Sequence, residues 1–130
     1  MTTKQFLQEV REVIDLPEKW TKGAYARSNE DFRVVPLSSM EANCFCIVGA
    51  CLVNKFKLMQ AIPNDVYQRL SEQVLVMNPE VAEMEQVKDN PHTGRESLIK
   101  YRSILVAYND LPSTTHANIL ALIDSTIEGV

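Results

Sequence analysis

The sequence is poor in glycine and has no long apolar run, and both features exclude classes of protein. The 130 residues include 4 Gly and 6 Pro, unlike a fibrous repeat or a disordered tail. The longest apolar run, Cys44–Val53, is about half of the roughly 20 residues that a membrane-spanning helix needs. No apolar core of a signal peptide follows Met1. We therefore expect a single domain over residues 1–130 that is cytoplasmic and has no membrane partner.

Basic residues are in the minority. The chain has 13 Lys+Arg and 17 Asp+Glu, which gives a net charge of -4 and a pI near 5.2. No overall positive field attracts nucleic acid, so we do not expect a nucleic-acid partner. The charge is nevertheless uneven, because an acidic segment at 79–88 contrasts with Lys22 and Arg27 near Trp20. The sequence thus contains two candidate surfaces of opposite character.

The spacing of apolar residues predicts a mainly α fold, with five or six helices and one small β-hairpin at about residues 20–36. Apart from the apolar run around Cys44–Val53, five stretches carry the helical pattern with clear start or stop residues. We expect a loop at 89–94. The run around Cys44–Val53 fits a buried helix or a buried strand, and its length favours a central helix that begins at Ser38 and Ser39. The expected helices are 3–15, about 41–57, 64–77, a short acidic one at 79–88, one ending near Ala107, and a last one closed by Gly129.

Three cysteines, Cys44, Cys46 and Cys51, lie within eight residues. An odd count at this spacing does not suggest a disulfide scaffold, and on a helix Cys46 would point away from Cys44, which argues against a metal site. We interpret them as buried structural thiols and expect neither a metal nor a cofactor. The enzymatic alternative is a nucleophilic Cys44 with His92 or His116 as its base.

Two separated segments could form a ligand site. Trp20 could stack on a nucleotide while Lys22 and Arg27 neutralise its charge, although a buried Trp20 with solvated cations explains the same residues. Asn109 and Asp110 follow a predicted helix and suit a structural turn. If that turn is buried, Asp110 needs a cation, and Arg27 is the natural candidate.

These segments carry three motifs: Trp20-x-x-Gly-x-x-Ala-Arg27, Cys46-x-x-Gly-Ala50 and Tyr108-Asn-Asp110. The set resembles a family of small uncharacterised bacterial and phage proteins, a domain of unknown function, over residues 20–53 and 108–127. Two departures are a Tyr at 108, where the family pattern has Trp, and a stretch at 78–95 that is longer than usual. The resemblance implies a helical domain with a small hairpin in which Trp20, Arg27, Asn109 and Asp110 meet. It carries over no activity.

Two hypotheses about function remain open. The first is a non-enzymatic binding protein that acts through a protein partner or by self-association. One version is a phage protein that blocks a host defence enzyme, or imitates nucleic acid through Glu80, Glu83 and Glu85. The second is a pocket for a nucleotide-like ligand, with or without catalysis, formed by Trp20, Arg27, Asn109 and Asp110.

Overall fold

The computed structural model describes residues 1–59, 61–88 and 95–130, and it is mainly helical, as the sequence predicts. The expected loop at 89–94, which includes His92, lies outside the described residues. An antiparallel pair of short strands accompanies the helices, and its presence was also predicted. The elements in chain order are α1 (Thr3–Val13), the 3-10 helix η1 (Pro17–Lys19), β1 (Ala26–Arg27), β2 (Cys44–Phe45), α2 (Ile47–Leu58), α3 (Val66–Met77), the 3-10 helix η2 (Pro79–Glu83), α4 (Glu85–Lys88), α5 (Arg95–Asp110) and α6 (His116–Glu128).

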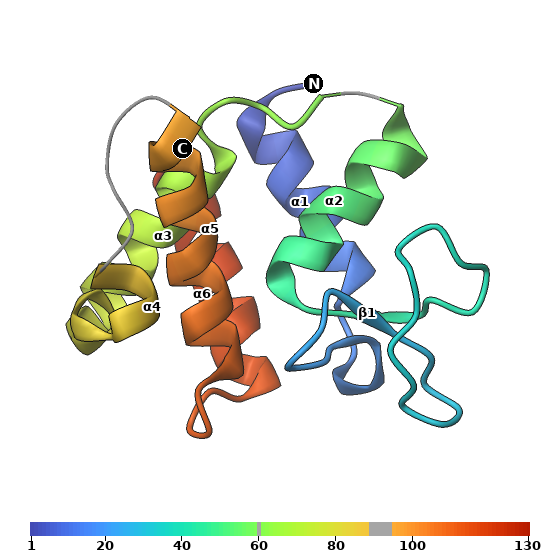
Figure 1. The fold of residues 1–130 in the computed structure, drawn as a ribbon. Helices are drawn as coiled ribbons and strands as arrows, with labels where there is room; N and C mark the ends of the chain where they lie inside the picture. Colours follow the sequence, from blue (N-terminus) through green and yellow to red (C-terminus); the bar gives the residue numbers. More distant parts are fainter. Residues whose placement is uncertain (60, 89–94) are drawn as a thin grey trace.

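The helices pack in two neighbouring groups (Figure 1). Helix α3 packs against both α5 and α6, while α1 packs against α2. The two groups are joined where α1 meets α6 and where α2 meets α5. Both strands lie at one end of α2, next to the loops of residues 20–45 (Figure 1). Every helix longer than two turns contributes to one cluster of buried residues, whose largest fully buried side chains are Phe6, Leu7, Ile14, Ile47, Leu70, Leu105, Ile119, Leu122 and Ile123.

Local sequence signals set the first and last helices. Thr2 caps α1, and Gln5 returns a bond to the Thr2 amide, which completes a capping box. Thr115 and Asn118 form the same reciprocal arrangement at the start of α6. Both helices therefore begin where side chains bond amides that the helix itself leaves free.

The strand pair uses a different partner from the one expected. Ala26 lies opposite Phe45 and Arg27 opposite Cys44, so the second strand comes from beyond residue 36. The expected partner segment supplies one isolated bridge, between Arg27 and Val34. The predicted range of 20–36 is therefore too short, because the strand that completes the pair belongs to the apolar run.

Helix α2 begins at Ile47, and our prediction that it begins at Ser38–Ser39 is wrong. Cys46 is its N-cap, with the thiol sulfur accepting a bond from the Gly49 amide at 3.3 Å. The preceding residues cannot be helical because Cys44 and Phe45 pair with β1. Packing against another segment, rather than propensity, sets the start of this helix.

Two further boundaries differ from the prediction. The acidic stretch 79–88 forms η2 and α4, two short turns broken at Met84, and its buried side chains are Val81 and Val87. Helix α5 continues past Ala107 to Asp110. Asn109 and Asp110 are thus the last residues of a helix and not part of a separate turn.

Candidate functional site

The side chain of Asn109 joins three parts of the chain at the end of α5. Its Oδ1 accepts bonds from the Trp20 indole Nε1 at 2.8 Å and from the Ile47 amide at 3.1 Å. Its Nδ2 donates to the Thr21 carbonyl at 3.0 Å and to Asp110 Oδ1 at 2.9 Å. Asn109 is fully buried, and this set of bonds satisfies its amide completely. We call this meeting point of residues 20–23, 46–49 and 108–110 the junction.

The other predicted site residues are also bonded within the fold. Asp110 Oδ1 accepts a bond from the Gly23 amide at 3.0 Å. Arg27 donates to the Phe32 carbonyl at 2.8 Å and to the Lys22 carbonyl at 3.4 Å. No ion pair among the described residues joins Arg27 to Asp110, so the expected pair does not form. The structure thus brings Trp20, Asn109 and Asp110 together and leaves Arg27 bonded to loop carbonyls.

The motif glycines are needed for close packing. A Cβ added at Gly49 would lie 2.0 Å from the Tyr25 carbonyl oxygen, so only glycine lets α2 approach this backbone. Gly23 has a φ of +77°, a left-handed conformation that glycine adopts at little cost. The spacing of the motifs is therefore explained by how the segments fit together.

Burial makes the cysteines poor nucleophiles. All three are buried and free, as interpreted from the sequence. Burial raises the pKa of the Cys46 thiol to about 11, with a smaller contribution from the nearby Asp110 charge. Cys44 lies in β2 and its thiol donates to the Arg27 carbonyl at 3.2 Å, while His116 contacts the Ile14 carbonyl. The proposed pair of Cys44 and His116 therefore has no support from their contacts.

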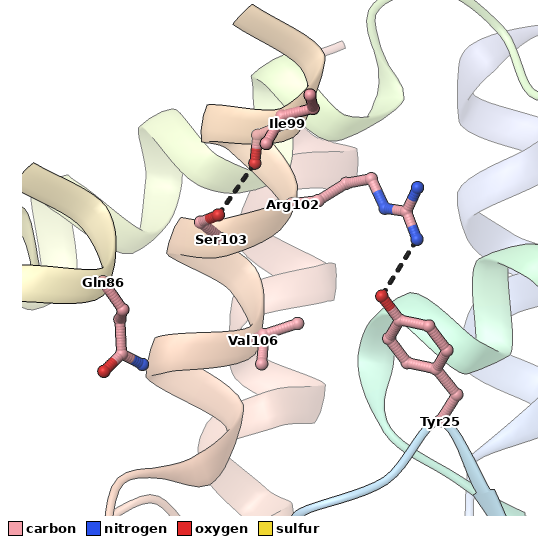
Figure 2. Close-up of a pocket in the computed structure, with 6 residues that line it drawn as sticks. All are labelled: Tyr25, Gln86, Ile99, Arg102, Ser103 and Val106. Carbon is pink, nitrogen blue, oxygen red and sulfur yellow. Dashed lines mark hydrogen bonds between the residues drawn. The ribbon is translucent and has the colours of Figure 1, made fainter. Parts of the chain in front are cut away.

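Beyond the junction, α5 lines a cleft. A cavity of about 400 Å³ lies between α5, Gln86 of α4 and Tyr25 beside β1 (Figure 2). Arg102 extends from α5 across this space and donates to the Tyr25 hydroxyl at 3.0 Å (Figure 2). Its guanidinium carbon lies 5.7 Å from the centre of the Tyr25 ring. Arg102 is only half-buried, and none of the ion pairs among the described residues includes it.

A larger cavity of about 640 Å³ adjoins the first, because Arg102 lines both. Its wall combines apolar and aromatic side chains, among them Leu52, Ile62, Leu98 and Tyr101, with the exposed Lys55. Tyr67 also lines it, with its ring centre 6.0 Å from the Arg102 guanidinium carbon. We call the two cavities together the Arg102 cleft. Each of the two volumes is in the range of small-molecule pockets in proteins.

The phenol of Tyr67 lacks a partner. The residue is 6% exposed, and its buried hydroxyl makes no hydrogen bond in the described part of the chain. Burial is the main cause that raises the pKa of this phenol well above its usual range, so the hydroxyl keeps its proton. The wall of the cleft therefore includes a residue with a neutral, buried O–H donor, and a guanidinium lies over its ring.

One protein-family model matches residues 1–129, which is nearly the whole chain. The chain belongs to DUF6197, a family of unknown function. The expected membership of an uncharacterised family is thus confirmed. No curated protein and no solved structure matches the chain.

The described part of this DUF6197 member has neither a metal-binding cluster nor a membrane-spanning helix. In the described ranges, no group of three His, Cys, Asp or Glu side chains is arranged to hold a metal ion. None of the helices described is long and apolar enough to cross a membrane.

Sequence reasoning missed the Arg102 cleft. Leu98 and Tyr101 belong to the apolar stripe of α5, but Leu98 is 45% exposed and both residues line the larger cavity. The one available signal was Arg102, which lies beside the stripe. Leu98 and Val106 occupy the positions one turn before and after it, so no acidic residue there could pair with it. Nothing in the sequence shows that Tyr25 and Tyr67 come together around it.

Proposed function

We propose that this protein is a non-enzymatic binding protein that holds the anionic group of a ligand at Arg102. The observation that carries the proposal is the half-buried guanidinium, which bonds one tyrosine hydroxyl and no carboxylate in the described part of the chain. Most of its N–H donors have no protein partner among the described residues. An anion that binds here forms charge-assisted hydrogen bonds, which are among the stronger ones in proteins.

The lining of the Arg102 cleft supports binding rather than catalysis. Its described residues include two cations, Lys55 and Arg102, and no Asp, Glu, His or Cys. No side chain there is suited to accept a proton near neutral pH, because the Tyr67 phenol has a raised pKa. The charge of the cleft is positive although that of the whole chain is negative.

The test is a titration with inorganic phosphate, followed by the NMR signal of the Arg102 Nε–H group. We expect a saturable shift of this signal and a loss of affinity of at least about tenfold in Arg102→Gln, because a hydrogen bond to a charged group is removed. The control is Arg33→Gln, which removes the same charge from an exposed pair with Glu41 and should leave the affinity unchanged.

A phosphate titration that leaves the Arg102 signal in place would overturn the proposal. Equal losses of affinity in the two variants would do the same, since they would show an effect of net charge only. The predicted protein partner and phage origin stay predictions.

A further inference from the structure

The lining of the larger cavity limits the kind of anion that fits the Arg102 cleft. This inference about the ligand rests on the proposed function. We infer that the ligand is an amphipathic organic anion: its carboxylate lies between Arg102 and the Tyr67 hydroxyl, and its aromatic or branched aliphatic body lies against the apolar wall. Neither a bare inorganic anion nor a neutral hydrocarbon would use both parts of this cavity.

The larger cavity is lined by a tyrosine whose hydroxyl has no partner in the described residues. Three buried side-chain atoms lack a hydrogen-bond partner in the described residues: Asn54 Nδ2, the Tyr67 hydroxyl and Thr114 Oγ1. Of these residues, Tyr67 lines the larger cavity, and Arg102 lines it too. A buried donor without a partner is costly, so a ligand oxygen that accepts its proton removes that cost on binding.

Arg102 and Tyr67 are close enough to share one carboxylate. The guanidinium lies over the Tyr67 ring, with 6.0 Å between its carbon and the ring centre. The hydroxyl is shielded from solvent, so neighbouring side chains have to shift before an anion reaches it. A carboxylate has two oxygens, and one can accept from the guanidinium while the other accepts from the phenol.

The apolar part of the cavity accounts for the rest of the ligand. The apolar part of its wall includes Leu52, Ile62, Pro63, Leu98 and Tyr101, and Leu98 remains 45% exposed although it is a large apolar side chain. Covering such surface with an apolar group is favourable in proportion to the area removed from water. Lys55, exposed at the same cavity, adds a second positive charge for a ligand that approaches from solvent.

The test uses a matched series of four probes: phenylpropionate, propionate, phenylpropanol and phenylpropylamine. Binding is followed by NMR through the Arg102 Nε–H group and the amides of α5. We expect phenylpropionate to bind at least about tenfold more tightly than each of the others, because only it combines the ring with the negative charge. Tyr67→Phe should weaken phenylpropionate by about tenfold, since it removes a hydrogen bond to a charged group.

The control variant is Tyr108→Phe, which deletes the same hydroxyl from a buried tyrosine of α5 that does not line the larger cavity. It should leave the affinity for phenylpropionate unchanged. Equal affinities for propionate and phenylpropionate, or no effect of Tyr67→Phe, would overturn the ligand class while the binding of anions at Arg102 stands. If phosphate does not shift the Arg102 signal, the proposed function itself fails.

Discussion

The C-terminal end and the middle of α5 differ in how their polar side chains are bonded. At its C-terminal end, Asn109 is fully buried and uses its whole amide for bonds within the fold. Along its middle, Arg102 makes one hydrogen bond and the neighbouring Tyr67 hydroxyl makes none in the described part of the chain. A polar group bonded to capacity stabilises the fold, whereas an unpaired one gives a ligand something to bind. The motifs that carry the family resemblance are therefore explained by the fold, and the unpaired groups lie in the Arg102 cleft.

The largest effect should come from Gly49→Ala, which tests whether the junction is structural. The new Cβ would overlap the Tyr25 carbonyl oxygen, so α2 and the strand pair have to separate. We expect a loss of about 3 kcal/mol or more in the free energy of unfolding, measured by urea denaturation followed by helical circular dichroism. Gly129→Ala is the control, because its Cβ would have no neighbour nearer than 3.6 Å, and it should change stability by less than about 0.5 kcal/mol. Similar stabilities of the two variants would contradict the close approach.

A smaller loss is expected from Asn109→Ala. It leaves the Trp20 indole N–H and the Ile47 amide without their acceptor, and the cost should be about 3 kcal/mol. The control is Asn29→Ala, an exposed asparagine whose side chain accepts one bond from Asn43 and whose loss should cost under about 1 kcal/mol. Urea denaturation followed by circular dichroism compares the stabilities of Asn109→Ala and Asn29→Ala.

The folded fraction of Asn109→Ala should still bind phosphate and phenylpropionate with wild-type affinity, because the amide does not line the Arg102 cleft. A stable Asn109→Ala that had lost its affinity for these anions would reverse the comparison and make the junction the site.

Tyr67→Phe should have the opposite effect on stability to Asn109→Ala. Removing a buried hydroxyl that bonds nothing in the described chain should leave the free energy of unfolding unchanged or raise it by up to about 1 kcal/mol. Thermal and urea unfolding of the two variants provide the measurement. A loss above about 1 kcal/mol would mean that the hydroxyl contributes to the fold and is not free for a ligand.

The smallest effect on the free energy of unfolding is expected from the exposed cluster of Thr3, Asp65 and Arg69. The Thr3 hydroxyl, and then Arg69, lower the pKa of Asp65 below its usual range. A lowered pKa in the folded state gives stability that is present at neutral pH and is lost as the pH falls through the folded value. Asp65 is 39% exposed, so this contribution should be below about 1 kcal/mol.

The measurement is the difference in unfolding free energy between wild type and Asp65→Asn. It should shrink towards zero when the pH is lowered from about 7 to about 3. In the Asp65→Asn background, Thr3→Val should add no further dependence on pH. A difference that stays constant with pH would show that the carboxylate is not stabilised by these partners.

The parts of the fold that were predictable depend on nearby residues. Apolar spacing and the Thr2–Gln5 capping box fix α1, and Gly129 follows the end of α6 as expected. The start of α2 was missed because the pairing of Cys44 and Phe45 with β1 decides it, and that pairing joins distant segments. Propensity alone favours a longer helix there.

The candidate site was predictable only in part. The meeting of Trp20, Asn109 and Asp110 follows from motifs that a family resemblance connects. The Arg102 cleft has no such motif, because Tyr25, Tyr67 and Arg102 come from three separate segments and meet only through packing. A sequence shows which side chains carry polar groups, but the folded structure shows which of those groups remain unpaired.

The central claim is tested most directly by an NMR titration of the wild-type protein with phenylpropionate. The chain has 1 Trp, so the indole signal of Trp20 reports on the junction without ambiguity, and the Arg102 Nε–H signal reports on the cleft. We predict saturable shifts at Arg102, Tyr67 and Leu98, with the Trp20 indole and Gly23 amide signals unmoved. Shifts concentrated at Trp20 and Gly23, with Arg102 unchanged, would contradict the account.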